Sequence, residues 1–270
     1  MFEPSVEPPP LNELAFQYQP VAALVAREPT WLEALIRWNL PDGTVRGPLE
    51  VLPHWLADNR QDVFTRFSIE RVAAVLARYE AAQVSINLSP RQLVSPVTNG
   101  VLEGLLPHVA SRLRIELTEQ RFGDTRRLWS SIAAVRRLCG AVMLDDVTEA
   151  DLRDRIPDGD MVDGVKVDRS VTLDLVEGRR RSRAERFIAE LSKRFPIVVV
   201  EGVEDVSLCE HFATLGASHV QGFGIGRPSP EPVFTLGEPS LPVVEATAAK
   251  ASRLNLGSLL LGGSDSELNA

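Results

Sequence analysis

Apolar and polar residues alternate along the chain in a pattern that predicts strands separated by helices. Eight segments have the length, β-branched content and boundaries of strands, at residues 15–21, 31–38, 83–88, 113–119, 141–145, 162–168, 197–201 and 218–222. Apolar residues at helical spacing predict helices over about 64–82, 182–194 and 205–215, with further helices after Ser89, through Trp129 to Leu138, and near 149–156. Residues 39–60 are rich in proline and glycine and are expected to form turns.

Strand and helix alternate at intervals of roughly 25–35 residues, which is typical of parallel βαβ units. Eight such units favour a single α/β domain of the TIM-type (β/α)8 barrel class. A doubly wound open sheet is the alternative, but no glycine-rich phosphate-binding sequence follows the first strand. We therefore expect an N-terminal arm at 1–14, a barrel domain at 15–230, and a partly disordered Gly/Ser/Ala-rich tail at 231–270.

The last inward-facing position of nearly every predicted strand is polar. In a parallel barrel these positions line the mouth, because alternate residues of each strand point inward. Their apolar neighbours along the strands would face the helices. The polar set is Glu33, Asn87, Glu116, Asp145, Lys166, Glu201 and Gln221.

This set is rich in oxygen ligands, and Asp146 adds a further carboxylate directly after Asp145. Only Lys166 and Arg37 oppose the acidic groups, so several carboxyl groups would stay protonated unless cations bind. Oxygen-only ligation favours Mg²⁺ or Mn²⁺ over zinc. Two ions about 4 Å apart, with Asp145 bridging and Asp146 on the second, would support attack of water on phosphorus. Lys166 would orient that water or stabilise phosphoryl charge, or else neutralise its acidic neighbours; both roles can hold together.

Composition adds exclusions. A net charge of −8 argues against a surface that coats nucleic acid, and no DNA partner is expected. No apolar run approaches the roughly 20 residues that span a bilayer, and the N-terminus lacks the features of a signal peptide, so a cytoplasmic location is expected.

Cys139 and Cys209 are expected to be buried free thiols. The four histidines do not have zinc-site spacing, and His219 is expected to be a core residue.

The motifs together resemble the EAL domain family of cyclic di-GMP phosphodiesterases. The resemblance covers about residues 15–228. It rests on Glu33-Ala34-Leu35 followed by Arg37-Trp38, on Tyr18-Gln19-Pro20-Val21, Ser85-Ile86-Asn87-Leu88-Ser89, Ile115-Glu116-Leu117-Thr118-Glu119, Val165-Lys166-Val167-Asp168, Glu201-Gly202-Val203-Glu204 and Gln221-Gly222-Phe223.

The resemblance implies a TIM-type barrel whose first strand is antiparallel, and hydrolysis of cyclic di-GMP to linear pGpG with two Mg²⁺ or Mn²⁺ ions. It implies one ion on Glu33, Asn87, Glu116 and Asp145, and the other on Asp145, Asp146 and Glu201. It implies catalytic roles for Lys166, Glu201 and Glu204, and contacts with the substrate or its site for Gln19, Leu35, Arg37 and Gln221. Glu119 would anchor a neighbouring loop, and Glu204 would act in loop anchoring or ligand orientation.

One segment departs from the family pattern. Val147-Thr148-Glu149-Ala150-Asp151-Leu152 stands where the family usually has Phe-Gly-Thr-Gly-Tyr-Ser, so both glycines are lost. This leaves three interpretations: an active phosphodiesterase, a degenerate EAL domain that binds cyclic di-GMP or a protein partner without turnover, or a barrel that acts on another phosphodiester. A homodimer is possible by resemblance, although the altered loop weakens that inference.

Overall fold

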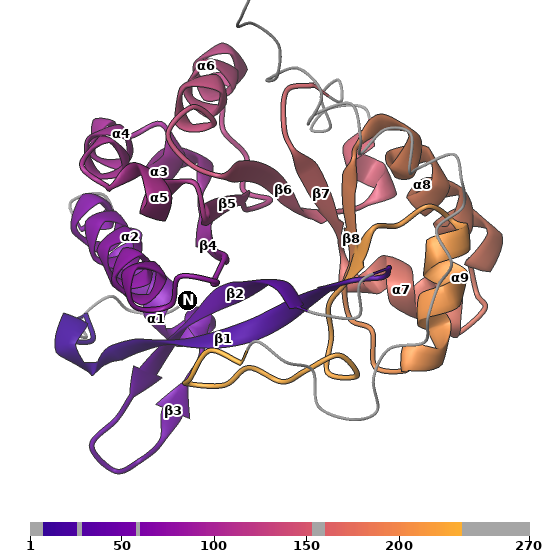
Figure 1. The fold of residues 1–270 in the computed structure, drawn as a ribbon, viewed down its shortest axis with the longest axis horizontal. Helices are drawn as coiled ribbons and strands as arrows, with labels where there is room; N and C mark the ends of the chain where they lie inside the picture. The colour runs from indigo at the N-terminus through magenta and orange to yellow at the C-terminus, as the bar shows by residue number, and fades with distance from the viewer. Residues whose placement is uncertain (1–7, 26–28, 58–59, 153–159, 234–270) are drawn as a thin grey trace, which may run out of the picture.

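The computed structural model describes residues 8–25, 29–57, 60–152 and 160–233. Its centre is a ring of strands: β1 (Leu14–Ala23), β2 (Pro29–Asn39), β4 (Val84–Leu88), β5 (Leu113–Leu117), β6 (Ala141–Val147), β7 (Gly164–Val167), β8 (Ile197–Val200) and β9 (His219–Val220). The sheet order is β1-β9-β8-β7-β6-β5-β4-β2-β3, and β1 also pairs with β2, which closes the ring (Figure 1). The predicted TIM-type barrel is confirmed.

Strand β1 runs antiparallel to both of its neighbours, β2 and β9, whereas the other neighbours in the ring are parallel. The antiparallel first strand is therefore confirmed as well. Tyr18 also pairs with Ser229, which draws the chain after β9 back onto β1.

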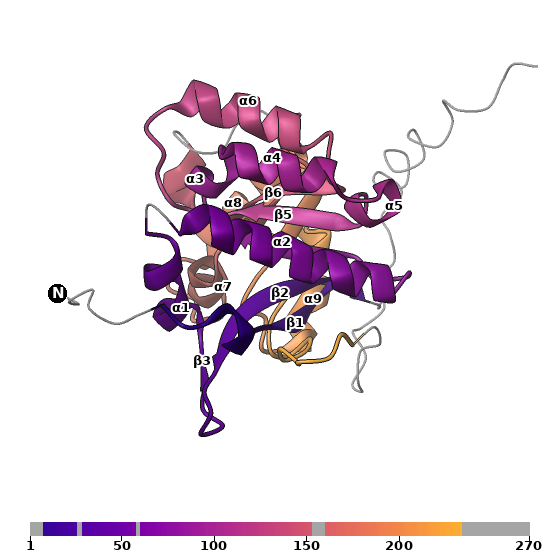
Figure 2. The ribbon, with the colours of Figure 1, turned by 90° about the vertical axis from the view of Figure 1, so that its left-hand side faces the viewer.

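Helices surround the ring, and Figure 2 shows α2, α4 and α6 lying side by side over β5 and β6. The helices are α1 (Pro48–Trp55), α2 (Gln61–Arg78), α3 (Pro90–Leu93), α4 (Pro96–Glu103), α5 (Pro107–Ala110), α6 (Thr125–Val135), α7 (Arg169–Val176), α8 (Arg181–Arg194) and α9 (Cys209–Thr214). Short 3₁₀ helices occupy Leu11–Glu13, Glu149–Leu152 and Val206–Leu208.

The expectation that residues 39–60 form turns holds for the turn at 41–43 but not for the segment that follows it. A short strand, β3 (Val45–Arg46), pairs with β2, and α1 follows it. Helix α1 starts at Pro48, whose fixed φ suits the first helical position, and the Glu50 side chain accepts a hydrogen bond from the Gly47 amide at 3.1 Å. Helix α7 was also missed, because it begins directly after the β7 residues without an intervening turn signal.

Apolar side chains form a large layer between the strands and the helices and a small cluster inside the ring. The interior cluster contains Val21, Trp31, Met143 and Val199, which fill the barrel below its mouth. A third cluster under α1 includes Ile36, Val51, Trp55 and Phe64.

Two hydrogen bonds tie the residues just before β1 to the rest of the domain. The Trp55 indole donates to the Pro9 carbonyl at 3.0 Å, and the Trp38 indole donates to Glu13 at 2.9 Å. The expected tail lies outside the described residues from 234 onward. The proposed domain boundaries stay predictions.

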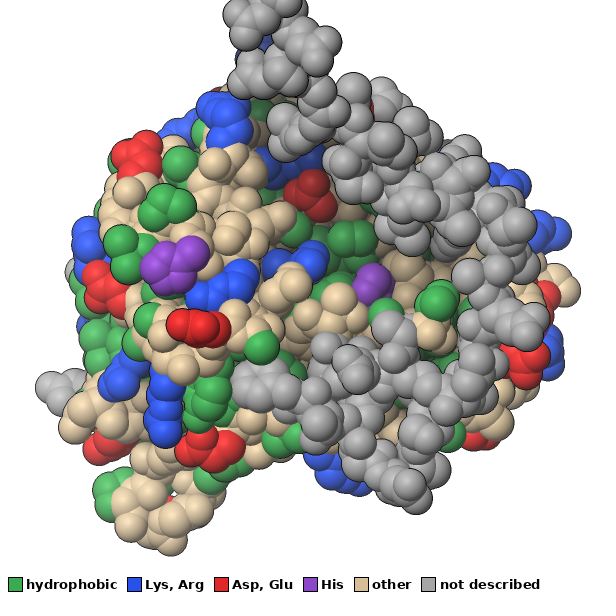
Figure 3. Space-filling view, in the orientation of Figure 1, with side chains coloured by type: hydrophobic (Ala, Val, Ile, Leu, Met, Phe, Trp, Pro, Cys, Tyr) green, Lys and Arg blue, Asp and Glu red, His purple; other side chains and the backbone are tan. Residues whose placement is uncertain are grey.

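Acidic and basic side chains are interspersed on the coloured part of the face in Figure 3. The expectation that the chain binds no DNA stays a prediction. Within the described residues, no helix is both long and apolar enough to cross a membrane. Cys209 is buried and Cys139 is half-buried, and neither forms a disulfide.

Candidate active site

A buried lysine joins the polar residues at the mouth of the barrel. Lys166, on β7, is 1% exposed. Its Nζ atom lies within ion-pair distance of four carboxylates, at 3.0 Å from Glu33, 2.9 Å from Glu116, 3.1 Å from Asp145 and 2.6 Å from Glu201. These residues come from β2, β5, β6 and the end of β8, so the closed ring gathers residues that are far apart in the sequence.

Glu33 is held by amides as well as by Lys166. Asn87 donates to one of its oxygens at 2.6 Å and Gln221 donates to the other at 2.7 Å. Gln221 also lies 3.4 Å from Gln19, and Gln19 donates to the Gly226 carbonyl at 3.1 Å. The network therefore runs from β1 through β9 and β2 to β4, and it contains four of the predicted site residues.

The aspartate pair lies in a β-bulge. Leu144 pairs with Val165 and Val147 pairs with Val167, so Asp145 and Asp146 together oppose the single residue Lys166. Asp146 has φ 49°, which is rare for a residue other than glycine. Simple alternation would point Asp146 away from Asp145, whereas ligand oxygens of Asp145, Asp146 and Glu201 lie within 4.8 Å of one another.

The carboxyl groups other than Glu33 raise one another's proton affinity, whereas burial would raise the pKa of Glu33 but Lys166 and two amides lower it. Burial, followed by the charge of Glu33, raises the pKa of Glu116 to about 8. Burial and the adjacent Asp145 raise the pKa of Asp146 to about 6. Burial alone would lower the pKa of Lys166, but the four carboxylates hold it well above its ordinary value. One ammonium therefore leaves an excess of acidic groups, and such a set favours further cations.

The donor atoms fit a hard divalent ion. Within the described residues, Asn87 Oδ1 and Glu116 Oε1 are buried and have no hydrogen-bond partner. Buried oxygen acceptors without a partner are costly, and oxygen is the ligand that Mg²⁺ and Mn²⁺ prefer. Both atoms belong to the predicted ligand set, so the side chains suit such an ion.

A cavity of about 190 Å³ lies beside the carboxylates and is lined by polar residues on one side and apolar residues on the other. Asn87, Asp145, Asp146 and Glu119 line its polar side. The apolar side includes Leu35, with Phe16, Leu52, Leu56 and Phe64 from β1, α1 and α2. The sequence reasoning missed the α1 residues; the Gly47-Pro48 pair followed by Glu50 was the signal that could have revealed their helix.

Arg37 is oriented by local contacts. Its Nε donates to Gln17 at 3.0 Å and its Nη1 donates to the Ile36 carbonyl at 2.8 Å. Burial lowers its pKa, while the charge of Glu33 opposes this effect. The predicted substrate roles of Arg37 and Leu35 stay predictions.

Two predicted residues lie further out. Glu204 is exposed and pairs with Arg169 at 2.8 Å. Glu119 is exposed, and within the described residues it has no hydrogen bond to 148–152, although its charge contributes to the raised pKa of Asp146. Their predicted catalytic and anchoring roles stay predictions.

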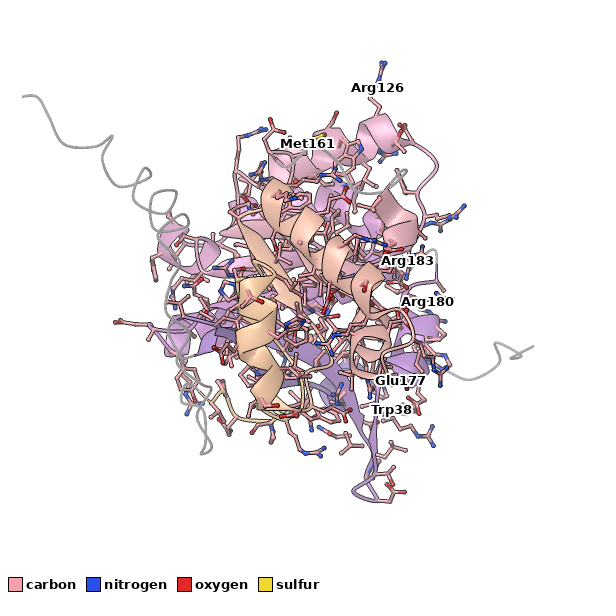
Figure 4. The ribbon with its side chains drawn as sticks, turned by 90° about the vertical axis from the view of Figure 1, so that its right-hand side faces the viewer. Trp38, Arg126, Met161, Glu177, Arg180 and Arg183 are labelled. Carbon is pink, nitrogen blue, oxygen red and sulfur yellow. The ribbon has the colours of Figure 1, made fainter. Side chains whose placement is uncertain are left out.

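The altered segment forms a compact turn. Its 3₁₀ helix is preceded by Thr148, whose amide and hydroxyl both donate to Asp151 at 2.8 Å. Glu149 pairs with Arg183 near the start of α8, and Figure 4 shows Arg183 beside Arg180. Side-chain bonds thus hold this segment without either family glycine.

Comparison with known proteins identifies relatives of this arrangement. The sequence model of the EAL domain matches residues 10–228. An uncharacterized signaling protein of Caulobacter vibrioides is 28% identical over 83% of this chain and 29% of its own length. The cyclic di-GMP phosphodiesterase NbdA of Pseudomonas aeruginosa is 29% identical over 81% of this chain and 29% of its own length.

Solved structures share the fold. The FimX EAL domain of Xanthomonas citri, in complex with c-diGMP, superposes with a TM-score of 0.70 at 19% identity, over 84% of this chain and 92% of that one. The chain spans about 30% of the length of the curated relatives above. With a family match over most of its length and the barrel described above, the chain belongs to the EAL domain family.

Proposed function

We propose that this chain hydrolyses cyclic di-GMP to linear pGpG with two divalent ions, Mg²⁺ or Mn²⁺. The observation that carries the proposal is the buried cluster in which Lys166 contacts Glu33, Glu116, Asp145 and Glu201. Relatives support the choice of substrate, since one is named a cyclic di-GMP phosphodiesterase and a structural neighbour holds the dinucleotide.

The ligand set divides between two ions in this proposal. Glu33, Asn87, Glu116 and Asp145 would hold one, while Asp145, Asp146 and Glu201 would hold the other. Divalent ions supply Lewis acidity that makes a water nucleophile available near neutral pH and offsets phosphate charge. The proximity of the Asp145, Asp146 and Glu201 oxygens supports the second group.

The protein's own residues account for the rest of the chemistry. Lys166 would hold the attacking water and stabilise charge on a phosphoryl oxygen. Water adds to one phosphorus, one P–O ester bond breaks, and the leaving ribose oxygen takes a proton, which yields pGpG. Gln19, Leu35, Arg37 and Gln221 would bind the dinucleotide, with the apolar wall of the cavity against a base.

The altered segment favours a second candidate, a domain that binds cyclic di-GMP or a protein partner without turnover. Its compact turn lacks both family glycines and directly follows Asp146. A change there would alter the second ion's ligands before the first's.

A turnover assay separates the candidates. Purified protein is incubated with cyclic di-GMP and Mg²⁺ or Mn²⁺, and the nucleotides are separated by chromatography. We expect pGpG from the wild type and none from Glu33→Ala. If the two proteins release equal background amounts while the wild type still binds cyclic di-GMP, the binding candidate replaces the hydrolase.

A panel of other phosphodiesters, including linear dinucleotides, tests whether the chain acts on a different substrate. Light scattering at several concentrations tests the proposed homodimer, and fractionation of cells tests the proposed cytoplasmic location.

A further inference from the structure

A second layer of polar and aromatic side chains lies below the carboxylates, inside the barrel. Residues two positions apart on a strand share a face. The positions two residues before Glu33, Glu116 and Gln221 therefore also point inward. They are occupied by Trp31, Arg114 and His219.

Trp31 contacts both of the other side chains, and we call the three residues together the stack. The Arg114 Cζ atom lies 4.5 Å from the centre of the Trp31 ring, within the range of a cation–π contact. The His219 ring lies 4.8 Å from the Trp31 ring at an angle of 52°. Arg114 is fixed further by two hydrogen bonds to Gln83, at 3.2 and 2.7 Å. Trp31 is 1% exposed, so its ring has little freedom to move.

The stack connects strands that share no backbone hydrogen bonds. Trp31 is on β2, Arg114 on β5 and His219 on β9. Strand β4 lies between β2 and β5, and β1 lies between β2 and β9. Backbone pairing therefore fixes the relative positions of these three strands only through an intermediate strand, whereas the stack does so directly.

The same three strands carry one continuous set of contacts at the mouth. Gln221 donates to Glu33 at 2.7 Å, and Lys166 bridges Glu33 and Glu116 at 3.0 and 2.9 Å. Each layer thus links β9, β2 and β5 in the same order. The neighbouring interior residues Val21, Met143 and Val199 pack with Trp31, so a smaller side chain there would leave a cavity under the carboxylates.

We propose that Trp31, Arg114 and His219 are positioning residues. They set the spacing of Glu33 and Glu116 for a divalent cation and the position of Gln221, which holds Glu33. The inference rests on the proposed function, because it concerns the same metal site. The stack acts on the ligands through the strands, without touching the ion or the substrate. Groups that orient metal ligands typically change metal affinity on the order of 10- to 100-fold when removed.

The test compares two arginines that lie two residues apart. Arg114→Met removes the charge above Trp31 and keeps much of the side-chain volume. Arg112→Met is the matched control, because Arg112 donates to the carbonyls of Leu76, Tyr79 and Ala82 at the end of α2. Arg114→Lys keeps a cation over the ring and serves as the conservative variant. The measurements are the Mn²⁺ dissociation constant by calorimetry without substrate, and the melting temperature.

We expect Arg114→Met to weaken Mn²⁺ binding about tenfold or more, with partial recovery in Arg114→Lys. Arg112→Met should lower the melting temperature and leave the Mn²⁺ dissociation constant within about twofold of wild type, since the helix end it caps lies outside the barrel. Trp31→Phe, which keeps an aromatic face in a smaller volume, should fall between wild type and Arg114→Met. The inference is overturned if Arg114→Met keeps wild-type Mn²⁺ affinity, whether or not its melting temperature falls.

Failure of the proposed function gives a different result. If wild type binds no more Mn²⁺ than Glu33→Ala, the metal assignment fails. A crystal structure of Arg114→Met then decides the positioning inference by itself. Displaced Glu33 and Glu116 carboxylates would support it, and unchanged contacts of Glu33 with Lys166 and Gln221 would overturn it.

Discussion

Lys166 dominates the site at the scale of single residues. Four carboxylates surround its buried ammonium group, and each is also close to at least one other acidic group. A buried ion pair adds little net stability, yet removal of one partner leaves an uncompensated charge. The lysine is therefore needed for the fold of the mouth, in addition to the role proposed for it in hydrolysis.

Lys166→Met is expected to lower the free energy of unfolding by about 3 kcal/mol or more and turnover by about 10²-fold or more. Urea denaturation followed by circular dichroism and the pGpG assay measure the two effects. Lys193→Met, at an exposed position on α8, is the control and should change neither. If Lys166→Met is as stable as the wild type, the negative charge of the carboxylates is offset by something other than Lys166, and the prediction is wrong.

The bulge in β6 is the feature that matters at the scale of elements. It places Asp145 and Asp146 opposite Lys166 and gives Asp146 its positive φ. A regular strand would put Asp146 on the opposite face, because side chains alternate. The extra residue in β6 therefore brings the carboxylates of two consecutive aspartates close together.

Two substitutions at Asp146 should separate the bulge from the charge. Asparagine tolerates positive φ, so Asp146→Asn should have the same free energy of unfolding as the wild type. Valine is strained there, and Asp146→Val should lose about 1–3 kcal/mol of stability. Both variants remove the carboxylate, so both should lose turnover. Equal stability of the two variants, measured by urea denaturation, would contradict the strained backbone.

Closure of the ring is the decisive feature at the scale of the whole molecule. Strand β1 completes the barrel by pairing with β2 and β9, and Tyr18 then pairs with Ser229. Because of this closure, Gln221 reaches the Glu33 carboxylate, and Gln19, the register partner of Glu33 on β1, lies beside Gln221.

A chain that ends at residue 233 should therefore keep the melting temperature of the full chain within about 2 °C, a shift that corresponds to about 1 kcal/mol or less for a barrel of this size. A chain that ends at 218 is the matched control, because it lacks β9 and Ser229 and cannot close the ring. We expect it not to fold cooperatively. Thermal denaturation followed by circular dichroism distinguishes them, and a large loss of stability on removal of 234–270 would contradict the predicted domain boundary.

Alternating apolar and polar residues determined the barrel and most of its mouth. Periodicity sufficed for the strands because each buries one face against helices. Polar residues at or near most strand ends marked the site, although Glu33 lies in the middle of β2. The predicted ends of the strands differ from the observed ones by a few residues; β6, for example, continues to Val147. Helix α1 was missed, since its prolines resemble those of turns.

Two features of the molecule were decided only by its tertiary structure: the direction of the Asp146 side chain and the contacts of Trp31. Alternation gave Asp145 its inward direction but could not give Asp146 the same one, because the bulge arises only where β6 pairs with β7. Nor could the sequence pair Trp31 with Arg114 and His219, since these residues meet only when non-adjacent strands close into a ring. The sequence by itself determined which side chains face the interior, through a local period of two. Which of them touch one another depends on long-range closure, which no local pattern contains.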